Sequence, residues 1–299
     1  MTITLTPRHT PLAVLRHELS LTSRLLADNA LASFLPGLLF TAAACAHHNI
    51  TGHARVPPLA TSIVLFALYQ YVFDTPNQAT GAEEDRGNKP HRPIPSGMVT
   101  SRGLLRRFWC AMPLYTLLSW LTGTLAWVLL WQAIVISLNL IARPRHYLWV
   151  KPITMLAGTG AQLAAAWQLV APLDAVAWHW VLILVVGFNL PLMFEDVRDM
   201  DGDARIGRRT LPLLIGHWPV RIWFALIMAA LPLVLHIMLF APTNAGPIAT
   251  ATCTLSTTAL SWTAAVRALL LRHVKADRIT YQLYTFTYAA ALACGSVLL

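Results

Sequence analysis

Nine apolar stretches, each about as long as a membrane-crossing helix, dominate this sequence of 299 residues. A helix that spans the hydrocarbon core of a bilayer needs about 20 mostly apolar residues. Only 12% of the residues are charged, whereas soluble globular proteins have roughly 25%. These values predict an all-α, polytopic membrane protein with nine transmembrane helices. The expected spans are residues 29–46, 56–75, 106–122, 124–141, 152–171, 175–193, 218–240, 246–270 and 279–298.

The first 27 residues lack the apolar core and small-residue cleavage site of a signal peptide. Leu12, Leu15, Leu19 and Leu26 recur at helical spacing, with charged residues on the rest of the turn. This pattern leaves two interpretations open, a short helix lying on the membrane surface and a solvent-facing extension.

Basic residues predict the orientation of the spans. If the N-terminus lies inside, Arg55 is the one Lys or Arg among 22 that falls in an outer loop. Positive residues stay on the cytoplasmic side of membrane proteins. The net charge of +9 therefore reports topology, and the sequence has no soluble basic face that would indicate a nucleic-acid partner. No feature indicates an obligate protein partner.

Eight of the thirteen carboxylates gather in two segments, residues 77–97 and 195–212. Each segment follows an apolar span, and each also contains Lys and Arg residues. Acids beside basic residues suit a divalent metal that in turn holds a phosphate-bearing ligand. We therefore expect both segments to build one polar site at the cytoplasmic edge of the membrane.

In the first segment, Glu84 and Asp85 follow Asn77 by seven and eight residues, so on a continuing helix they share one face. Such oxygen ligands suit Mg²⁺. Three prolines between residues 90 and 95 must end the helix. The resulting loop carries Lys89 and Arg92, which suit a phosphate. The alternative interpretation is a solvated charged loop.

The second segment places Asp196, Asp199 and Asp203 at i, i+3 and i+7, on one face of an expected helix. Three aligned carboxylates repel one another unless a cation neutralises them. The ligand spacing excludes an EF-hand. The alternative is that neighbouring arginines simply pair with these acids.

At these segments the sequence resembles the UbiA superfamily of intramembrane prenyl-converting enzymes. Asp196-x-x-Asp199-x-x-x-Asp203 followed by Gly-Arg-Arg-Thr-Leu-Pro matches the second Asp-rich motif of that family, and residues 88–97 match the run after its first motif. Lys151 resembles a basic residue that follows helix 4 of the family. The first motif departs, because Gln78 and Gly81 replace two acids. This departure resembles the branch that contains membrane terpene cyclases.

The resemblance implies one transmembrane domain over residues 1–299, with nine helices around a cytoplasmic-side cavity and residues 1–27 as a cytoplasmic N-terminal segment. It also implies Mg²⁺ as cofactor and a prenyl diphosphate as substrate. The expected metal ligands are Asn77, Glu84, Asp85, Asp196, Asp199 and Asp203. The expected diphosphate-binding residues are Lys89, Arg92, Lys151, Arg208 and Arg209.

Loss of diphosphate leaves a carbocation, which needs a dry cavity with aromatic faces. The candidates for this cavity are Tyr69, Trp149, Trp167, Phe188 and Phe194, each of which could instead face lipid or pack in the core. Asn189 is the candidate catalytic residue, because buried polar groups inside spans are costly and often functional. His47 and His48 fall on the outer side, too remote for this chemistry.

Three functions fit the sequence. The first is a Mg²⁺-dependent terpene cyclase acting on farnesyl or a longer prenyl diphosphate. The alternative is a prenyltransferase that moves the prenyl chain onto an aromatic or other acceptor. A third is a transporter or binding protein for phosphorylated lipids, although transporters place ionisable groups near mid-membrane. In each case the protein is surrounded by membrane lipid.

Overall fold

The computed structural model describes residues 10–299, whose regular elements are all helices, with no β-strand. The all-helical expectation is confirmed. The α-helices are α1 (Pro11–Leu26), α2 (Leu35–His47), α3 (Val56–Thr80), α4 (Ala82–Asn88), α5 (Ser101–Leu121), α6 (Leu125–Ile136), α7 (Tyr147–Gln168), α8 (Ala175–Asn189), α9 (Met200–Arg205), α10 (Leu211–Ile215), α11 (His217–Leu235), α12 (Pro247–Leu270) and α13 (Val274–Leu298).

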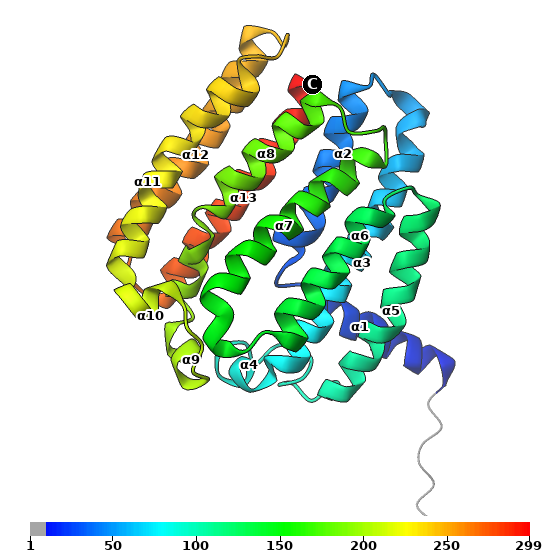
Figure 1. The fold of residues 1–299 in the computed structure, drawn as a ribbon, viewed down its shortest axis with the longest axis vertical. Coiled ribbons are helices and arrows are strands. Elements are labelled where there is room, and N and C mark those ends of the chain that lie inside the picture. Colours follow the sequence, from blue (N-terminus) through cyan, green and yellow to red (C-terminus); the bar gives the residue numbers. More distant parts are fainter. Residues whose placement is uncertain (1–9) are drawn as a thin grey trace, which may run out of the picture.

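The long helices lie side by side in one bundle, with the short helices α4 and α9 at one end and the C-terminus at the other (Figure 1). Within residues 10–299, four segments are long and apolar enough to cross a membrane, namely Ala30–His47, Gly52–Thr80, Ala175–Val197 and His217–Phe240. A shorter apolar helix covers Leu125–Ile141. The remaining long helices overlap the other expected spans, but their crossing of the membrane stays a prediction.

The helices α2, α6, α7 and α13 pack closely against their neighbours and form one wall of the bundle interior. The α2 helix packs against α13 and α7, and α7 packs against α6. At Gly158 in α7, an added Cβ would lie 2.3 Å from the indole ring of Trp131 in α6. Glycine at this position therefore allows the Trp131 ring to lie directly on the α7 backbone.

Each of the two acidic segments lies where a long helix ends. The α3 helix ends at Thr80, and α4 begins after Gly81. The α8 helix ends at Asn189, and a 3₁₀ turn over Leu192–Val197 leads to α9. Pro191 lacks the N–H that would continue α8. The expectation of one helix through the second segment is therefore wrong.

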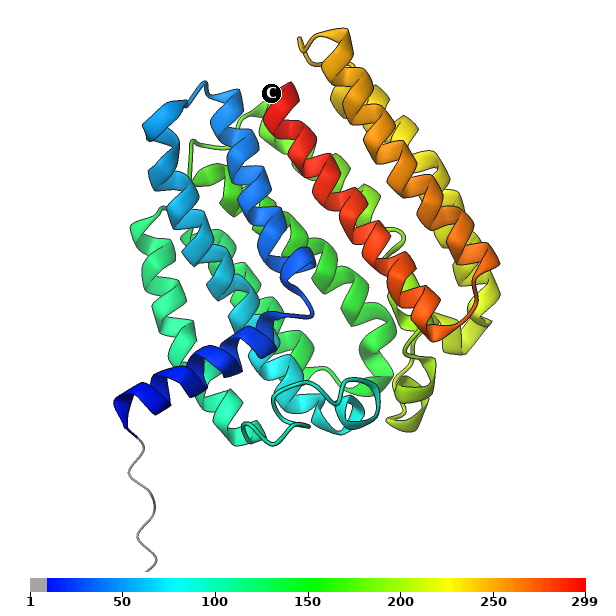
Figure 2. The same ribbon diagram turned by 180° about the vertical axis from the view of Figure 1, so that it is seen from behind.

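The α1 helix crosses the end of the bundle that carries α4 (Figure 2). Leu21 and Leu25 are buried against Ala79 and Leu104. Leu12 and Leu19 remain exposed, at 57% and 62%. The α1 helix is therefore anchored through Leu21 and Leu25 near its C-terminus and presents apolar side chains between Leu12 and Leu19. Residues 1–9 of the expected N-terminal segment lie outside the described residues.

Candidate active site

A cavity of about 480 Å³ lies inside the bundle and is lined by both acidic segments. Its volume falls in the usual range for small-molecule sites, roughly 300–1,000 Å³. All six expected metal ligands line it, although they come from four different elements. The lining includes Asn77 of α3, Glu84 and Asp85 of α4, Asp196 of the 3₁₀ turn, and Asp199 and Asp203 at α9.

Four of the five expected diphosphate-binding residues also line the cavity, namely Lys89, Arg92, Lys151 and Arg208. Arg209 does not; its side chain is exposed, and its backbone N–H donates to the carbonyl of Pro144. Residues 208–210 follow the turn at Ile206 and Gly207 without forming a helix, and the side chains of Arg208 and Arg209 lie in different surroundings. This placement corrects the expectation for Arg209.

Lys151 of α7 holds the second acidic segment. Its Nζ atom donates to Oδ1 of Asp196 across 2.6 Å and pairs with Oε2 of Glu195 at 3.1 Å. Oδ2 of Asp196 is buried and has no hydrogen-bond partner among the described residues. Asp196 therefore has a free ligand atom at the cavity. Because a buried carboxylate oxygen without a partner costs free energy, this atom favours binding of a cation.

Arg208 connects the two acidic segments. One of its terminal nitrogens, Nη1, lies 2.7 Å from Oδ1 of Asp203 and 3.0 Å from Oε2 of Glu84. Burial raises the pKa of Asp203 to about 7, against the opposing effect of the Arg208 guanidinium. Asp203 therefore titrates near neutral pH, whereas an ordinary aspartate is fully ionised there.

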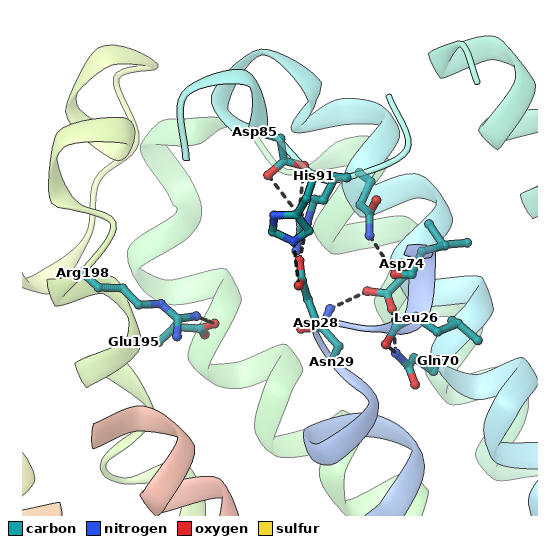
Figure 3. A network of polar contacts seen from close by, with 12 residues as sticks. Leu26, Asp28, Asn29, Gln70, Asp74, Asp85, His91, Glu195 and Arg198 are labelled. Carbon is teal, nitrogen blue, oxygen red and sulfur yellow. Dashed lines mark hydrogen bonds and ion pairs between the residues drawn. The ribbon is translucent and has the colours of Figure 1, made fainter. Parts of the chain in front are cut away.

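Arg92 holds the first acidic segment through Asp85 and also binds Asp28; Figure 3 labels both of these aspartates. Its Nη1 atom donates to both oxygens of Asp85, at 2.9 and 3.0 Å, and its Nε atom donates to Oδ2 of Asp28 across 2.9 Å. His91 lies 2.9 Å from the other oxygen of Asp28. Asp28 follows α1, so this network ties the end of α1 to the loop after α4.

A second polar network lies next to this one, around the fully buried Asp74 of α3. The side chains of Asn29 and Gln70 both donate to Asp74, and Gln70 also donates to the carbonyl of Leu26 (Figure 3). Sequence reasoning missed Asp28, Asn29 and Asp74. A lone carboxylate inside an apolar span was a signal that could have identified Asp74.

The donor chemistry of these residues fits Mg²⁺, which prefers carboxylate and other oxygen ligands. In this structure, however, a cationic side chain holds each of Asp85, Asp196 and Asp203. Among the described residues, His47, His48 and Asp174 form the one group of three His, Cys, Asp or Glu side chains whose ligand atoms all lie within 4.8 Å of one another. This group does not line the cavity. Mg²⁺ would find a free ligand atom at Oδ2 of Asp196, whereas Asp85 would have to exchange Arg92, which holds both of its oxygens, for the ion.

Gln78 and Gly81, which replace the two acids of the first motif, lie in different surroundings. Gln78 is buried and donates to the carbonyl of Leu25 across 2.9 Å, so it fastens α1. Gly81 lines the cavity. Asn77 donates from its side chain to Asn139, a further cavity residue that sequence reasoning missed.

Three of the five aromatic residues expected in the cavity lie elsewhere, which corrects those expectations. Trp149 is 71% exposed on the bundle surface. Trp167 is buried beside His47 and His48, and Phe194 stacks on Phe224 with ring centroids 4.2 Å apart. The surroundings of each aromatic ring depend on how the helices pack, which the sequence did not indicate.

Aromatic side chains nevertheless line the cavity. Tyr69 and Phe188 do so as expected, and the sequence reasoning missed Phe73, Trp131, Tyr281, Tyr284 and Tyr288. The Tyr69 ring stacks on Trp131 with centroids 4.1 Å apart. Three of the tyrosines lie three and four residues apart on α13, which places them on one helix face. Asn189 also lines the cavity and donates to the carbonyl of Val185 across 2.8 Å.

Comparison with known proteins identifies relatives over almost the full length of the chain. Residues 34–291 match the UbiA prenyltransferase family. The chain is 33% identical to somaliensene A/B synthase of Streptomyces somaliensis, over 98% of each protein. It is 35% identical to a diterpene cyclase of Hericium erinaceus, over 75% of this chain and 71% of that protein.

A solved structure shares the fold. A UbiA homolog from Archaeoglobus fulgidus, bound to DMAPP and Mg²⁺, superposes with a TM-score of 0.63 at 16% identity, covering 93% of this chain and 100% of that chain. The extent of the family match and the near-complete alignment with a relative agree with this fold. The chain is an integral membrane enzyme that belongs to the UbiA prenyltransferase family.

Proposed function

We propose that this enzyme is a Mg²⁺-dependent terpene cyclase, which ionises farnesyl diphosphate or a longer prenyl diphosphate and cyclises the resulting carbocation. The observation that carries the proposal is the composition of the cavity, which joins paired acids and bases to an aromatic wall. The similarity to a somaliensene synthase and a diterpene cyclase supports it. So do the homologous structures bound to DMAPP or GPP with Mg²⁺.

Ionisation breaks the bond between the allylic carbon and the diphosphate oxygen, and the electron pair stays on that oxygen. Bound Mg²⁺ supplies positive charge to the diphosphate as it leaves. Lys151, Arg92 and Arg208 already lie at the cavity wall with their charges directed at carboxylates. On substrate binding, these side chains would exchange carboxylate partners for diphosphate oxygens, which stabilises the leaving group.

The carbocation then forms a carbon–carbon bond with the π electrons of an alkene in the same chain. The reaction ends when a proton is lost from a neighbouring carbon, or when water adds and then loses a proton. The faces of Tyr69, Trp131 and Phe188 stabilise the positive charge through cation–π interactions. The aromatic wall also excludes water that would quench the cation early.

Prenyl transfer to an acceptor is the alternative function. The chain is 32% identical to a polyprenyl transferase of Hericium erinaceus, over 67% of this chain and 69% of that protein. The same ionisation would serve either reaction. The difference is whether an external nucleophile or an internal alkene captures the carbocation.

The proposal includes a membrane arrangement. The long helices over residues 29–298 cross the membrane nine times as one domain, with α4 and α9 on the cytoplasmic side. The Lys and Arg residues concentrated near α4 and α9 support this orientation. The prenyl chain then enters the cavity from the lipid, and the diphosphate lies at the cytoplasmic edge.

Purified protein with Mg²⁺ and either farnesyl or geranylgeranyl diphosphate, without an acceptor, tests the function directly. Released diphosphate is measured beside gas chromatography–mass spectrometry of a hexane extract. We expect a cyclic hydrocarbon or alcohol whose formation depends on Mg²⁺. Turnover only after adding an aromatic acid or quinone precursor would instead establish the prenyltransferase.

A further inference from the structure

Two adjacent histidines and an aspartate meet at the end of the bundle opposite α4 and α9, where α2 ends and α8 begins (Figure 1). The Nε2 atom of His47 lies 3.0 Å from Oδ2 of Asp174. One ligand atom from each of His47, His48 and Asp174 lies within 4.8 Å of the other two. We call these three residues the outer triad.

The outer triad contains one buried nitrogen atom that has no hydrogen-bond partner among the described residues. This atom is Nε2 of His48. The ring packs 4.8 Å from that of His47 and 5.8 Å from that of Trp167, measured between centroids. A buried imidazole nitrogen without a partner costs free energy unless a proton donor or a metal ion satisfies it.

Asp174 is held in position independently of the histidines. Its Oδ1 atom accepts a hydrogen bond of 2.7 Å from the backbone N–H of Ala177, which caps the N-terminus of α8. The other oxygen, Oδ2, faces His47. Second contacts of this kind orient the ligands of metal sites.

We propose that the outer triad binds a Zn²⁺ ion, with His47, His48 and Asp174 as its protein ligands. Imidazole nitrogen and carboxylate oxygen suit Zn²⁺ and similar transition metals, whereas Mg²⁺ prefers oxygen ligands alone. A tetrahedral site with bonds of about 2.0–2.1 Å separates neighbouring ligand atoms by about 3.3 Å. The paired atoms of His47 and Asp174 lie 3.0 Å apart, slightly closer than this spacing. His48 would supply the third protein ligand, from a ligand atom that lies within 4.8 Å of the other two.

A bound ion would connect the end of α2 to the start of α8 at the face opposite the proposed diphosphate site. It would therefore stabilise the bundle without taking part in the reaction. Anything that binds the folded protein alone raises its stability. The proposal does not depend on the proposed cyclase activity.

The test uses full-length protein in detergent, purified without a polyhistidine tag, stripped with a chelator, and saturated with Mg²⁺ to occupy the acidic segments. Zn²⁺ binding is measured by competition with a chromophoric chelator, and retained metal is measured by mass spectrometry. We expect about one tightly held Zn²⁺ per chain. Zn²⁺ should also raise the midpoint of thermal unfolding.

Matched variants separate the outer triad from other histidines. His48→Gln and Asp174→Asn should weaken Zn²⁺ binding at least about tenfold. Asn at position 174 can still cap α8, so this variant keeps the fold. His53→Gln removes an exposed histidine of the nearby loop and should bind Zn²⁺ as the wild type does. Equal Zn²⁺ binding by all four proteins, or none by the wild type, would overturn the proposal.

Discussion

Arg92 binds two aspartates at once, donating from Nε to Asp28 and from Nη1 to Asp85. Asp28 lies after α1 and does not line the cavity, whereas Arg92 and Asp85 do. Two hydrogen-bonded carboxylates fix the plane of a guanidinium group more firmly than one does. Asp28 therefore fixes the orientation of Arg92, a residue that we propose binds the diphosphate.

Asp28→Asn should raise the KM for prenyl diphosphate about tenfold and change kcat less, because it loosens a binding group. Glu18→Gln is the matched control, since Glu18 pairs with Arg107 and also anchors α1, outside the cavity. Steady-state kinetics of both variants distinguish positioning from anchoring. An equal rise in KM for both would show that Asp28 acts only by holding α1.

Asp196 and Asp201 lie in the same segment, but only Asp196 lines the cavity; Asp201 is exposed. Asp196→Asn keeps the side-chain shape and removes the charge that pairs with Lys151. We expect diphosphate release to fall by at least about 100-fold, because a group at the developing charge is lost. Asp201→Asn should retain activity. Size-exclusion chromatography confirms that both variants remain folded, and full activity of Asp196→Asn would remove it from the metal site.

The acidic segments could be recognised from sequence because charge is rare in an apolar chain, and the cavity brings them together as expected. The positions of individual ligands could not, because Pro191 and Gly81 break the helices on which Asp196 and Glu84 were placed. Sequence spacing predicts a shared face only while one helix continues.

The cavity wall was predicted less well than its polar end. Tyr281, Tyr284 and Tyr288 had helical spacing, but nothing local indicated that α13 faces the cavity. Trp167 sits on a helix that lines the cavity, yet its ring lies at the opposite end, beside His47. The depth of a residue along a helix, and the helix that it faces, depend on packing between distant segments.

Metal binding should depend on pH because burial raises the pKa of Asp203 to about 7. The carboxyl group must lose its proton to bind Mg²⁺, so apparent Mg²⁺ affinity should rise between about pH 6 and pH 8 and fall on acidification. Without Mg²⁺, stability should change with pH in the opposite direction. The reason is that Asp203 binds its proton more tightly in the folded state than in the unfolded state. The free energy of unfolding should then decrease as pH rises towards 7.

Thermal unfolding with and without Mg²⁺ across this pH range measures both effects. Asp201→Asn, which changes an exposed acid of the same helix, should leave both pH dependences in place. A Mg²⁺ affinity that stays constant across this range would contradict the role of Asp203 as a titrating ligand.

Aromatic faces should matter after ionisation. Phe188 lines the cavity, with its ring centroid 4.8 Å from that of Tyr288. Phe188→Leu should lower turnover about tenfold and give more linear or early-quenched products, because a cation–π contact is lost. Phe286→Leu is the control, since Phe286 lies on α13 and is 48% exposed. Product profiles by mass spectrometry decide this, and an unchanged profile for Phe188→Leu would remove it from cation stabilisation.

Restoring an acid to the first motif tests why this chain departs from the family pattern. Gly81 lines the cavity between α3 and α4, and an added Cβ would lie 3.0 Å from the carbonyl oxygen of Asn77, so only a small shift is needed. Gly81→Asp should lower the Mg²⁺ concentration for half-maximal activity about threefold, because an added carboxylate strengthens the metal site. It should also alter the ratio of cyclic products. Gly81→Asn adds similar bulk without charge and should leave the Mg²⁺ requirement unchanged. Prenylation of an added aromatic acceptor by Gly81→Asp, absent in the wild type, would mean that this one position separates cyclisation from transfer.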